Sequence, residues 1–283
     1  MLTTKFTQKI NKAGRWILSV NGRKTPPSLN VRIPPAWTDV LVDPDPDARI
    51  LATGVDLAGR KTKLYAAWHH AESKGSKFER IRALLTEWED IRTQIEADLN
   101  RRDISEKHRE CALIALLTYD TGIRPGSNTD TLAQVKAYGA TTLQLRHVKP
   151  CQRGVRLQFV GKKGVRQNIL VTNPYLVRVF MKRKRATTAW TTPLFTYSAS
   201  SLRDYFKTLG SGEYSPKDFR TACGTHLALE LIGNRQRFPK SQTRRKQIIN
   251  NVLDKVARKL GNTRAVSRSA YVDPVVVEQF MNA

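Results

Sequence analysis

The spacing of hydrophobic positions changes once along this chain, in the segment Glu72–Lys77. Between residues 31 and 67, short strand-like runs alternate with proline, glycine and aspartate, which predicts a small antiparallel sheet. From Phe78 to Asn100, apolar residues recur at every third or fourth position, which predicts an amphipathic helix. We therefore expect three parts: a basic N-terminal arm at 1–30 with a short strand at Trp16–Val20, a β-rich domain at 31–77, and a larger domain at 78–283.

The larger domain is predicted to be mainly helical around a small sheet. Helices are expected at residues 105–118, after Asn173-Pro174, from Ser200 or Ser201, from Ser215, and at 243–260. Strand-like runs at 141–148, 155–160 and 165–171 predict three antiparallel strands, the last two joined by the hairpin tip Gly161-Lys-Lys-Gly164. The fold class is therefore α+β, a small β-rich N-terminal domain followed by a mainly α-helical domain with a three-stranded antiparallel sheet.

The charge of the chain points to a polyanionic partner. Lysine and arginine number 49 against 24 aspartate and glutamate residues, a formal net charge of +25. Residues 1–100 carry 16 basic and 12 acidic residues, whereas residues 101–283 carry 33 and 12. A globular region with that excess repels itself unless it works against a polyanion, and nucleic acid is the first candidate. The alternative is a basic protein that meets nucleic acid without any chemistry.

Cysteine spacing and hydropathy further limit the classes of protein to which this chain can belong. Three widely spaced cysteines, at 111, 151 and 223, argue for a reducing compartment and against a disulfide framework or a zinc site. The five histidines show no helical ligand spacing with carboxylates, so we expect no metal centre. No apolar run approaches eighteen residues, and no cleavable signal pattern begins the chain. We expect a soluble intracellular protein, or one packaged in a particle.

The candidate for chemistry is Tyr271. It follows a basic helix and the helix-stopping Gly261, and it is flanked in sequence by Arg264 and Arg268. A phenol can attack phosphorus when cations lower its pKa and stabilise the charge that develops on the phosphate. The alternative is a tyrosine that merely packs in a C-terminal helix.

Residues earlier in the chain, Asn262 among them, can supply the cationic and hydrogen-bonding groups that an attack of Tyr271 on phosphorus needs. Arg124 is held on a turn because Pro125 follows it, and Arg220 lies one turn inside a helix capped by Ser215. Two arginines can bind non-bridging phosphate oxygens, a lysine can protonate a leaving hydroxyl, and an amide can donate one more hydrogen bond. The lysine is Lys162 or Lys163 and the amide is that of Asn262. No metal is demanded where cationic side chains surround the phosphate.

These pieces resemble the type IB DNA topoisomerases of the small bacterial and poxvirus kind. The resemblance covers roughly residues 30–275 in matching order: Ile33-Pro-Pro-Ala-Trp-Thr-Asp-Val40, Ala52-Thr-Gly-Val-Asp56 with Gly59-Arg-Lys61, Asp120-Thr-Gly122, Tyr138-Gly-Ala-Thr-Thr-Leu143 with Arg146-His-Val148, Phe159-Val-Gly-Lys-Lys-Gly164, Lys217-Asp-Phe-Arg-Thr221, and Leu260-Gly-Asn-Thr263 with Ser267-Arg-Ser-Ala-Tyr271.

The resemblance implies an enzyme that relaxes supercoiled duplex DNA by transient single-strand cleavage, controlled rotation and religation, with neither ATP nor a divalent metal. It implies that Tyr271 forms a 3′-phosphotyrosyl bond, that Arg124 and Arg220 bind the phosphate, and that Lys162 is the general acid, with Lys163 close enough to leave the register open. Asn262 stands where viral members have histidine. The further residues expected to contact DNA are Arg60, Lys61, Tyr65, Arg146, Lys163, Lys217, Arg264 and Arg268.

The same resemblance implies a monomer that clamps duplex DNA, without a membrane partner. It places the protein in the cytoplasm with the nucleoid, or in a virion and the host cytoplasm if the source is viral.

One segment departs from the family pattern. After Arg124 the chain has Pro125-Gly-Ser-Asn-Thr-Asp130, which looks more like the Arg-x-Gly turn of tyrosine recombinases. A recombinase with the same chemistry is therefore the alternative. Recombinases usually have histidine three residues before the second arginine, where this chain has Lys217, and their N-terminal region is helical rather than β-rich. A non-catalytic DNA-binding relic of the fold is a third possibility, against which the intact set of site residues argues.

Overall fold

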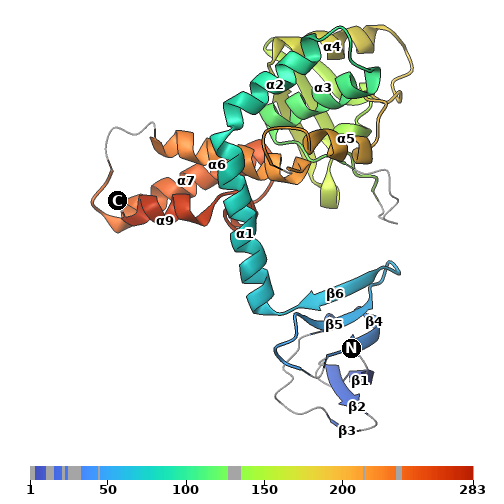
Figure 1. Ribbon diagram of the computed structural model, residues 1–283, viewed down its shortest axis with the longest axis vertical. Coiled ribbons are helices and arrows are strands. Elements are labelled where there is room, and N and C mark those ends of the chain that lie inside the picture. Colours follow the sequence, from blue (N-terminus) through green and yellow to red (C-terminus); the bar gives the residue numbers. More distant parts are fainter. Residues whose placement is uncertain are drawn as a thin grey trace. The chain divides into compact units, whose positions relative to one another are not determined.

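The computed structural model describes residues 4–10, 16–20, 23–24, 33–43, 45–126, 135–212, 214–233 and 238–282 of the 283-residue chain. The chain divides into two compact units, Met1–Lys77 and Phe78–Ala283. This division falls at the end of the segment in which the hydrophobic spacing changes. Figure 1 labels β1–β6 of the first unit and most of the helices.

The first unit is built on a six-stranded antiparallel sheet in the order β3-β2-β1-β4-β5-β6. The strand bounds are β1 Thr4–Ile10, β2 Trp16–Val20, β3 Arg23–Lys24, β4 Thr38–Val42, β5 Ile50–Val55 and β6 Lys61–Tyr65. The structure departs here from the separate arm expected at residues 1–30, because β1 pairs with β4 at Thr4↔Val42. A small core of Ile33, Trp37, Val40, Val42 and Ala52 forms within this unit.

The helix expected from Phe78 to Asn100 is in fact two helices. Helix α1 spans Ala67–Thr86 and α2 spans Trp88–Asn100. Glu87 interrupts them with φ −101° and ψ 9°, and its carboxylate accepts hydrogen bonds from Ser211 and Tyr214. The segment Glu72–Lys77, expected as a boundary between domains, is helical and belongs to α1. The chain therefore enters the second unit within a continuous helix.

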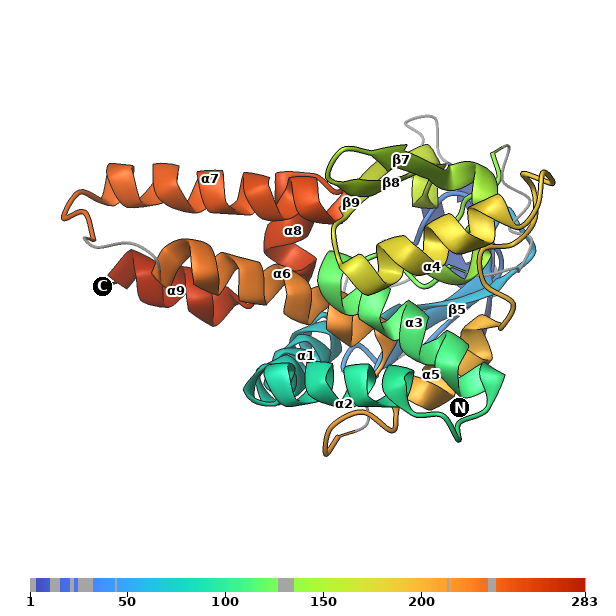
Figure 2. The ribbon, with the colours of Figure 1, turned by 90° about the horizontal axis from the view of Figure 1, so that it is seen from above.

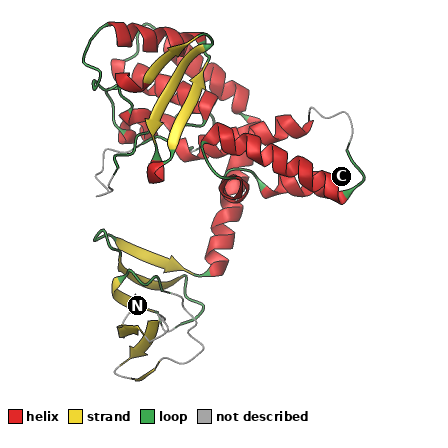
Figure 3. Ribbon diagram, turned by 180° about the vertical axis from the view of Figure 1, so that it is seen from behind, coloured by secondary structure: helices red, strands yellow, loops and turns green. Residues whose placement is uncertain are grey.

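A three-stranded antiparallel sheet, β7-β8-β9, lies in the second unit, as the sequence predicts (Figure 3). Strands β8 Gly154–Val160 and β9 Arg166–Val171 match their expected places. The first strand was expected at 141–148, but β7 spans Val148–Cys151 and short 3₁₀ turns occupy Ala140–Thr142 and Leu145–His147. The amides of Ala140 and Thr141 donate to the carbonyls of Arg124 and Pro125, and these bonds draw the segment out of the sheet.

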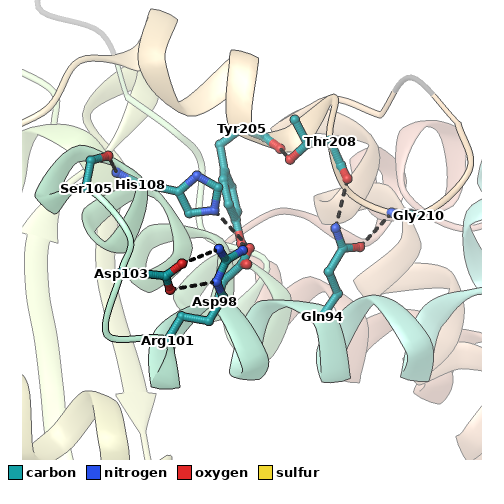
Figure 4. Close-up of polar contacts among 9 residues, drawn as sticks. All are labelled: Gln94, Asp98, Arg101, Asp103, Ser105, His108, Tyr205, Thr208 and Gly210. Carbon is teal, nitrogen blue, oxygen red and sulfur yellow. Dashed lines mark hydrogen bonds and ion pairs between the residues drawn. The ribbon is translucent and has the colours of Figure 1, made fainter.

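Helices α3 Glu106–Thr121, α4 Pro174–Arg185 and α5 Ala199–Phe206 pack with this sheet around one large core. Ser105 and Asn173 cap α3 and α4 as expected, whereas Ser198 caps α5 in place of Ser200 or Ser201. Figure 4 shows how α2, α3 and α5 are joined: the Asp98 carboxylate accepts from Tyr205 at 2.8 Å and from His108 at 3.1 Å.

The C-terminal helices α6 Pro216–Gly233, α7 Gln242–Leu260, α8 Arg264–Ala270 and α9 Pro274–Asn282 enclose a second core (Figure 2). Helix α7 ends at Gly261, which adopts φ +59° as a glycine C-cap does. None of the helices in the described ranges is long and apolar enough to cross a membrane.

Candidate active site

Tyr271 lies in the short connection between α8 and α9. Its amide donates to the carbonyl of Ser267 at 3.0 Å, and its own carbonyl accepts from the Thr225 hydroxyl of α6 at 3.3 Å. Gly224 allows this close contact, because a Cβ at that position would lie 2.5 Å from the Tyr271 carbonyl oxygen. Helix α6 therefore fixes the backbone that carries the phenol.

Arg220 presents its guanidinium to the phenol from α6. The guanidinium carbon lies 4.8 Å from the centre of the Tyr271 ring, and the residue is only 3% exposed. Its two terminal nitrogens donate to the carbonyls of Gly122 and Leu260, which lie at the C-terminal ends of α3 and α7. Helix C-termini carry partial negative charge, so two helix ends stabilise the buried cation.

Arg220 carries a buried positive charge. Among the described residues no carboxylate forms an ion pair with it, and its Nε is buried without a hydrogen-bond partner. Buried polar atoms are nearly always paired. An unpaired N–H beside an uncompensated positive charge is suited to an anion.

Arg124 and Asn262 complete the cluster. The Arg124 Nη2 atom donates to Asn262 Oδ1 at 2.8 Å, while the Nδ2 of Asn262 is buried and unpaired. The backbone near Arg124 is fixed by a crossing of two glycines, since a Cβ on Gly139 would lie 2.5 Å from the Cα of Gly126. The departure from the family pattern after Arg124 thus has a structural use: Gly126, at φ +85°, makes this crossing possible.

The two arginines act on the pKa of the tyrosine. Burial raises the pKa of Tyr271, but the neighbouring positive charges of Arg220 and Arg124 lower it below its ordinary value. Burial, with the nearby charge of Arg124, also lowers the pKa of Arg220. The strongest cationic effects on the phenol therefore come from Arg220 and Arg124, which are distant in sequence, rather than from its sequence neighbours Arg264 and Arg268. Arg264 instead binds the Asp254 carboxylate through two nitrogens at 2.7 and 2.6 Å.

The structure brings together four of the five predicted catalytic residues: Arg124, Arg220, Asn262 and Tyr271. Lys162 lies exposed at the tip of the β8–β9 hairpin, and no hydrogen bond or ion pair within the described part of the chain joins its ammonium to the four. Lys163 beside it has a left-handed backbone, with φ +63°. The structure thus leaves the choice between the two lysines open.

Gln167 connects this hairpin to the cluster, and sequence reasoning missed it. Its side chain lies against Gly261, where a Cβ would come within 2.1 Å of the Gln167 Oε1 atom, and against Gly161 at the base of the hairpin. It is 8% exposed although its neighbours in the strand, Arg166 and Asn168, are exposed. The feature that marks Gln167 is a buried glutamine in contact with two glycines. The sequence alone does not show it, because only the fold brings Gly161 and Gly261 to the same neighbour.

The residues expected to contact DNA are spread over both units. Arg60, Lys61 and Tyr65 belong to the Met1–Lys77 unit, where the Arg60 guanidinium lies 2.7 Å from the Asp56 carboxylate. In the other unit, Arg146 donates to the hydroxyl of Tyr138 at 2.7 Å. Lys217 and Arg268 are exposed on α6 and α8. No group of three or more His, Cys, Asp or Glu side chains in the described ranges is placed to hold a metal ion.

Comparison with known proteins identifies the family of this chain. Residues 66–281 match the family described as "Eukaryotic DNA topoisomerase I, catalytic core", and residues 29–56 match "Bacterial DNA topoisomerase IB, N-terminal domain". A relative from Acanthamoeba polyphaga mimivirus, named "DNA topoisomerase 1B", is 28% identical over 300 residues, covering 99% of this chain and 82% of its own.

The chain belongs to the DNA topoisomerase I catalytic-core family. Within that family it is of type IB, whose members are ATP-independent isomerases that act on DNA. The predicted family is confirmed, and the recombinase alternative is not favoured.

We expect Arg220→Ala to raise the pKa of Tyr271. In the variant the largest cationic effect opposing burial would be lost and that of Arg124 would remain, so the phenol would ionise at higher pH than in the wild type. NMR titration of ¹³Cζ-labelled tyrosine measures this directly. Arg101→Ala is the control, because Arg101 pairs with Asp103 at the exposed turn of Figure 4, and it should leave the titration unchanged. An unaltered Tyr271 curve in Arg220→Ala would contradict the role given to Arg220.

Gly261→Ala should destabilise the second unit more than Gly164→Ala does. Both positions have positive φ, which costs about 1–2 kcal/mol for a residue with a Cβ. Only at Gly261 would the Cβ also overlap Gln167, whereas nothing lies within 4 Å of a Cβ at Gly164. Denaturant unfolding of both variants tests the difference. Equal losses in the free energy of unfolding would show that Gln167 moves aside freely.

Proposed function

We propose that this chain relaxes supercoiled duplex DNA with Tyr271 as its nucleophile. The observation that carries the proposal is a phenol held against a buried guanidinium that has no carboxylate partner among the described residues, with a second arginine and an amide beside it. Phosphoryl transfer depends on positioning and on stabilising the charge that develops on the phosphate. Two arginines and one amide donor meet both requirements.

In the proposed reaction the Tyr271 oxygen attacks a backbone phosphorus and loses its proton to solvent. A bond forms between that oxygen and phosphorus, and the bond from phosphorus to the 5′ oxygen breaks. Lys162 gives its proton to the departing 5′ oxygen, which leaves as a hydroxyl. The phosphate stays on the 3′ end as a tyrosine ester. The energy of the cleaved phosphodiester bond is therefore kept in this ester while the free DNA end rotates.

Each neighbouring residue has one part in this step. Arg220 and Arg124 bind the non-bridging oxygens, since guanidinium groups donate in a geometry that matches phosphate. The unpaired Nδ2 of Asn262 donates to the same oxygens. Religation is the reverse: the 5′ hydroxyl attacks, Lys162 takes back its proton, and Tyr271 leaves.

The DNA is expected to follow a strongly basic surface. Between Asp130 and Asp204 the sequence has no acidic residue and 14 lysines and arginines. A groove of about 730 Å³ opens on the β8–β9 hairpin that carries Lys162, lined in part by Tyr138, Arg146, Lys149, Phe159 and Arg166. We propose that phosphates contact these cations together with Lys163, Lys217 and Arg268. We further expect a monomer, acting wherever its duplex DNA lies: the cytoplasm with the nucleoid, or the virion and host cytoplasm.

Relaxation of supercoiled plasmid in EDTA without ATP tests the chemistry. The wild type should relax both positive and negative supercoils, because the proposed step uses only side chains. Tyr271→Phe should relax neither and form no covalent adduct, while it still binds DNA. Tyr197→Phe, at a half-buried tyrosine of the same unit, is the matched control and should be fully active. Relaxation by Tyr271→Phe would exclude this nucleophile, and loss of wild-type activity in EDTA would exclude a metal-free mechanism.

Affinity for duplex DNA should fall steeply with salt. A protein that contacts 6–10 phosphates loses roughly 10³–10⁵ in affinity between 50 and 200 mM salt, because counterions are released on binding. We expect a loss in this range for Tyr271→Phe, which binds without cleaving. Fluorescence anisotropy over a salt series measures the slope, and a flat response would contradict the basic surface as the binding site.

A further inference from the structure

Asp273, two residues after Tyr271, is held from three sides. Its amide donates to the Thr225 hydroxyl at 3.1 Å, and its Oδ1 accepts from the amide of Val275, which caps α9. Its Oδ2 accepts from the Arg82 Nη1 atom of α1 at 2.8 Å. The Asp273 side chain is only 3% exposed. The place where α9 begins, and with it the Tyr271 segment, is therefore tied to α1.

Asp218, two residues before Arg220, has a matching arrangement. Its Oδ2 accepts from the amide and hydroxyl of Ser215, which forms the start of α6. Its Oδ1 accepts from the Arg80 Nη2 atom at 3.1 Å, and its side chain is 5% exposed. The helix start that orients Arg220 is tied to α1 as well.

Both cations therefore lie two positions apart on one helix and reach the two segments that carry Arg220 and Tyr271. Exposed ion pairs contribute little to stability, but a buried carboxylate that loses its cation is strongly disfavoured. Each pair thus resists displacement of its segment relative to α1. A misplacement of about 1 Å in reacting groups can cost roughly a hundredfold in rate.

We propose that Arg82 and Arg80 are positioning residues for the transesterification, which hold the Tyr271 and Arg220 segments in register through Asp273 and Asp218. This inference rests on the proposed function, and neither arginine is given a contact with the reacting phosphate. Arg82 has the more direct effect, because only two peptide units separate Asp273 from the nucleophile.

The test is the rate of covalent adduct formation under single-turnover conditions with saturating protein. The substrate is a duplex whose cleavage position is first mapped with the wild type. The protein is in excess over the duplex, so a fraction of misfolded protein leaves the rate unchanged as long as the folded protein saturates the DNA. Arg82→Ala should lower the rate roughly ten- to hundredfold. Arg82→Lys should recover most of it, and Arg101→Ala, at the exposed pair with Asp103, should leave it unchanged.

Asp273→Asn separates positioning from DNA binding. Asparagine keeps the α9 cap. The substitution removes no positive charge and adds no negative charge, so a loss of rate cannot come from a lost contact with phosphate. We expect it to lower the rate to a similar extent as Arg82→Ala. The double variant should be no slower than the slower single variant, because both remove one interaction.

The outcomes are distinguishable. If the wild type forms no adduct, the proposed function fails. If the wild type reacts while Arg82→Ala and Asp273→Asn react at its rate, the positioning role is wrong. Effects that multiply in the double variant would also overturn it, since the two residues would then act separately. Should Arg82→Ala not fold, Asp273→Asn still decides between these results.

Discussion

The site depends on a buried guanidinium that has no acidic partner in the part of the chain that the structure describes. Arg220 is satisfied by the carbonyl ends of α3 and α7, so its charge is stabilised by helix dipoles without being cancelled. Both helices end in a glycine with positive φ, Gly122 and Gly261, which lets their last carbonyls turn toward Arg220. A carboxylate in the same place would have neutralised the charge that Tyr271 and an incoming phosphate require.

Much of the site could be read from the sequence because its residues sit next to strong local signals. The Ser215-Pro216 helix start places Arg220, the glycine stop at Gly261 places Asn262, and Pro125 marks the turn after Arg124. Each of these signals acts within a few residues, so tertiary packing did not override it. The strands β8 and β9 were predicted for the same reason.

What the sequence could not reveal depends on contacts between distant segments. Arg264 and Arg268 flank Tyr271 in sequence, yet the cations that act on it come from α6 and from the turn after α3. The break at Glu87 depends on hydrogen bonds with residues more than a hundred positions away. The 3₁₀ turns before β7 arise from bonds to Arg124 and Pro125. No local spacing encodes these partners, and the same holds for the ion pairs from α1.

The most direct test of the central claim is to identify the atom that carries the DNA. A cleavage reaction stopped with detergent, digested with protease and nuclease, and read by mass spectrometry locates the adduct. We expect a nucleotide joined through its 3′ phosphate to the peptide that contains Tyr271. An adduct on another residue, or a 5′ linkage to Tyr271, would contradict it.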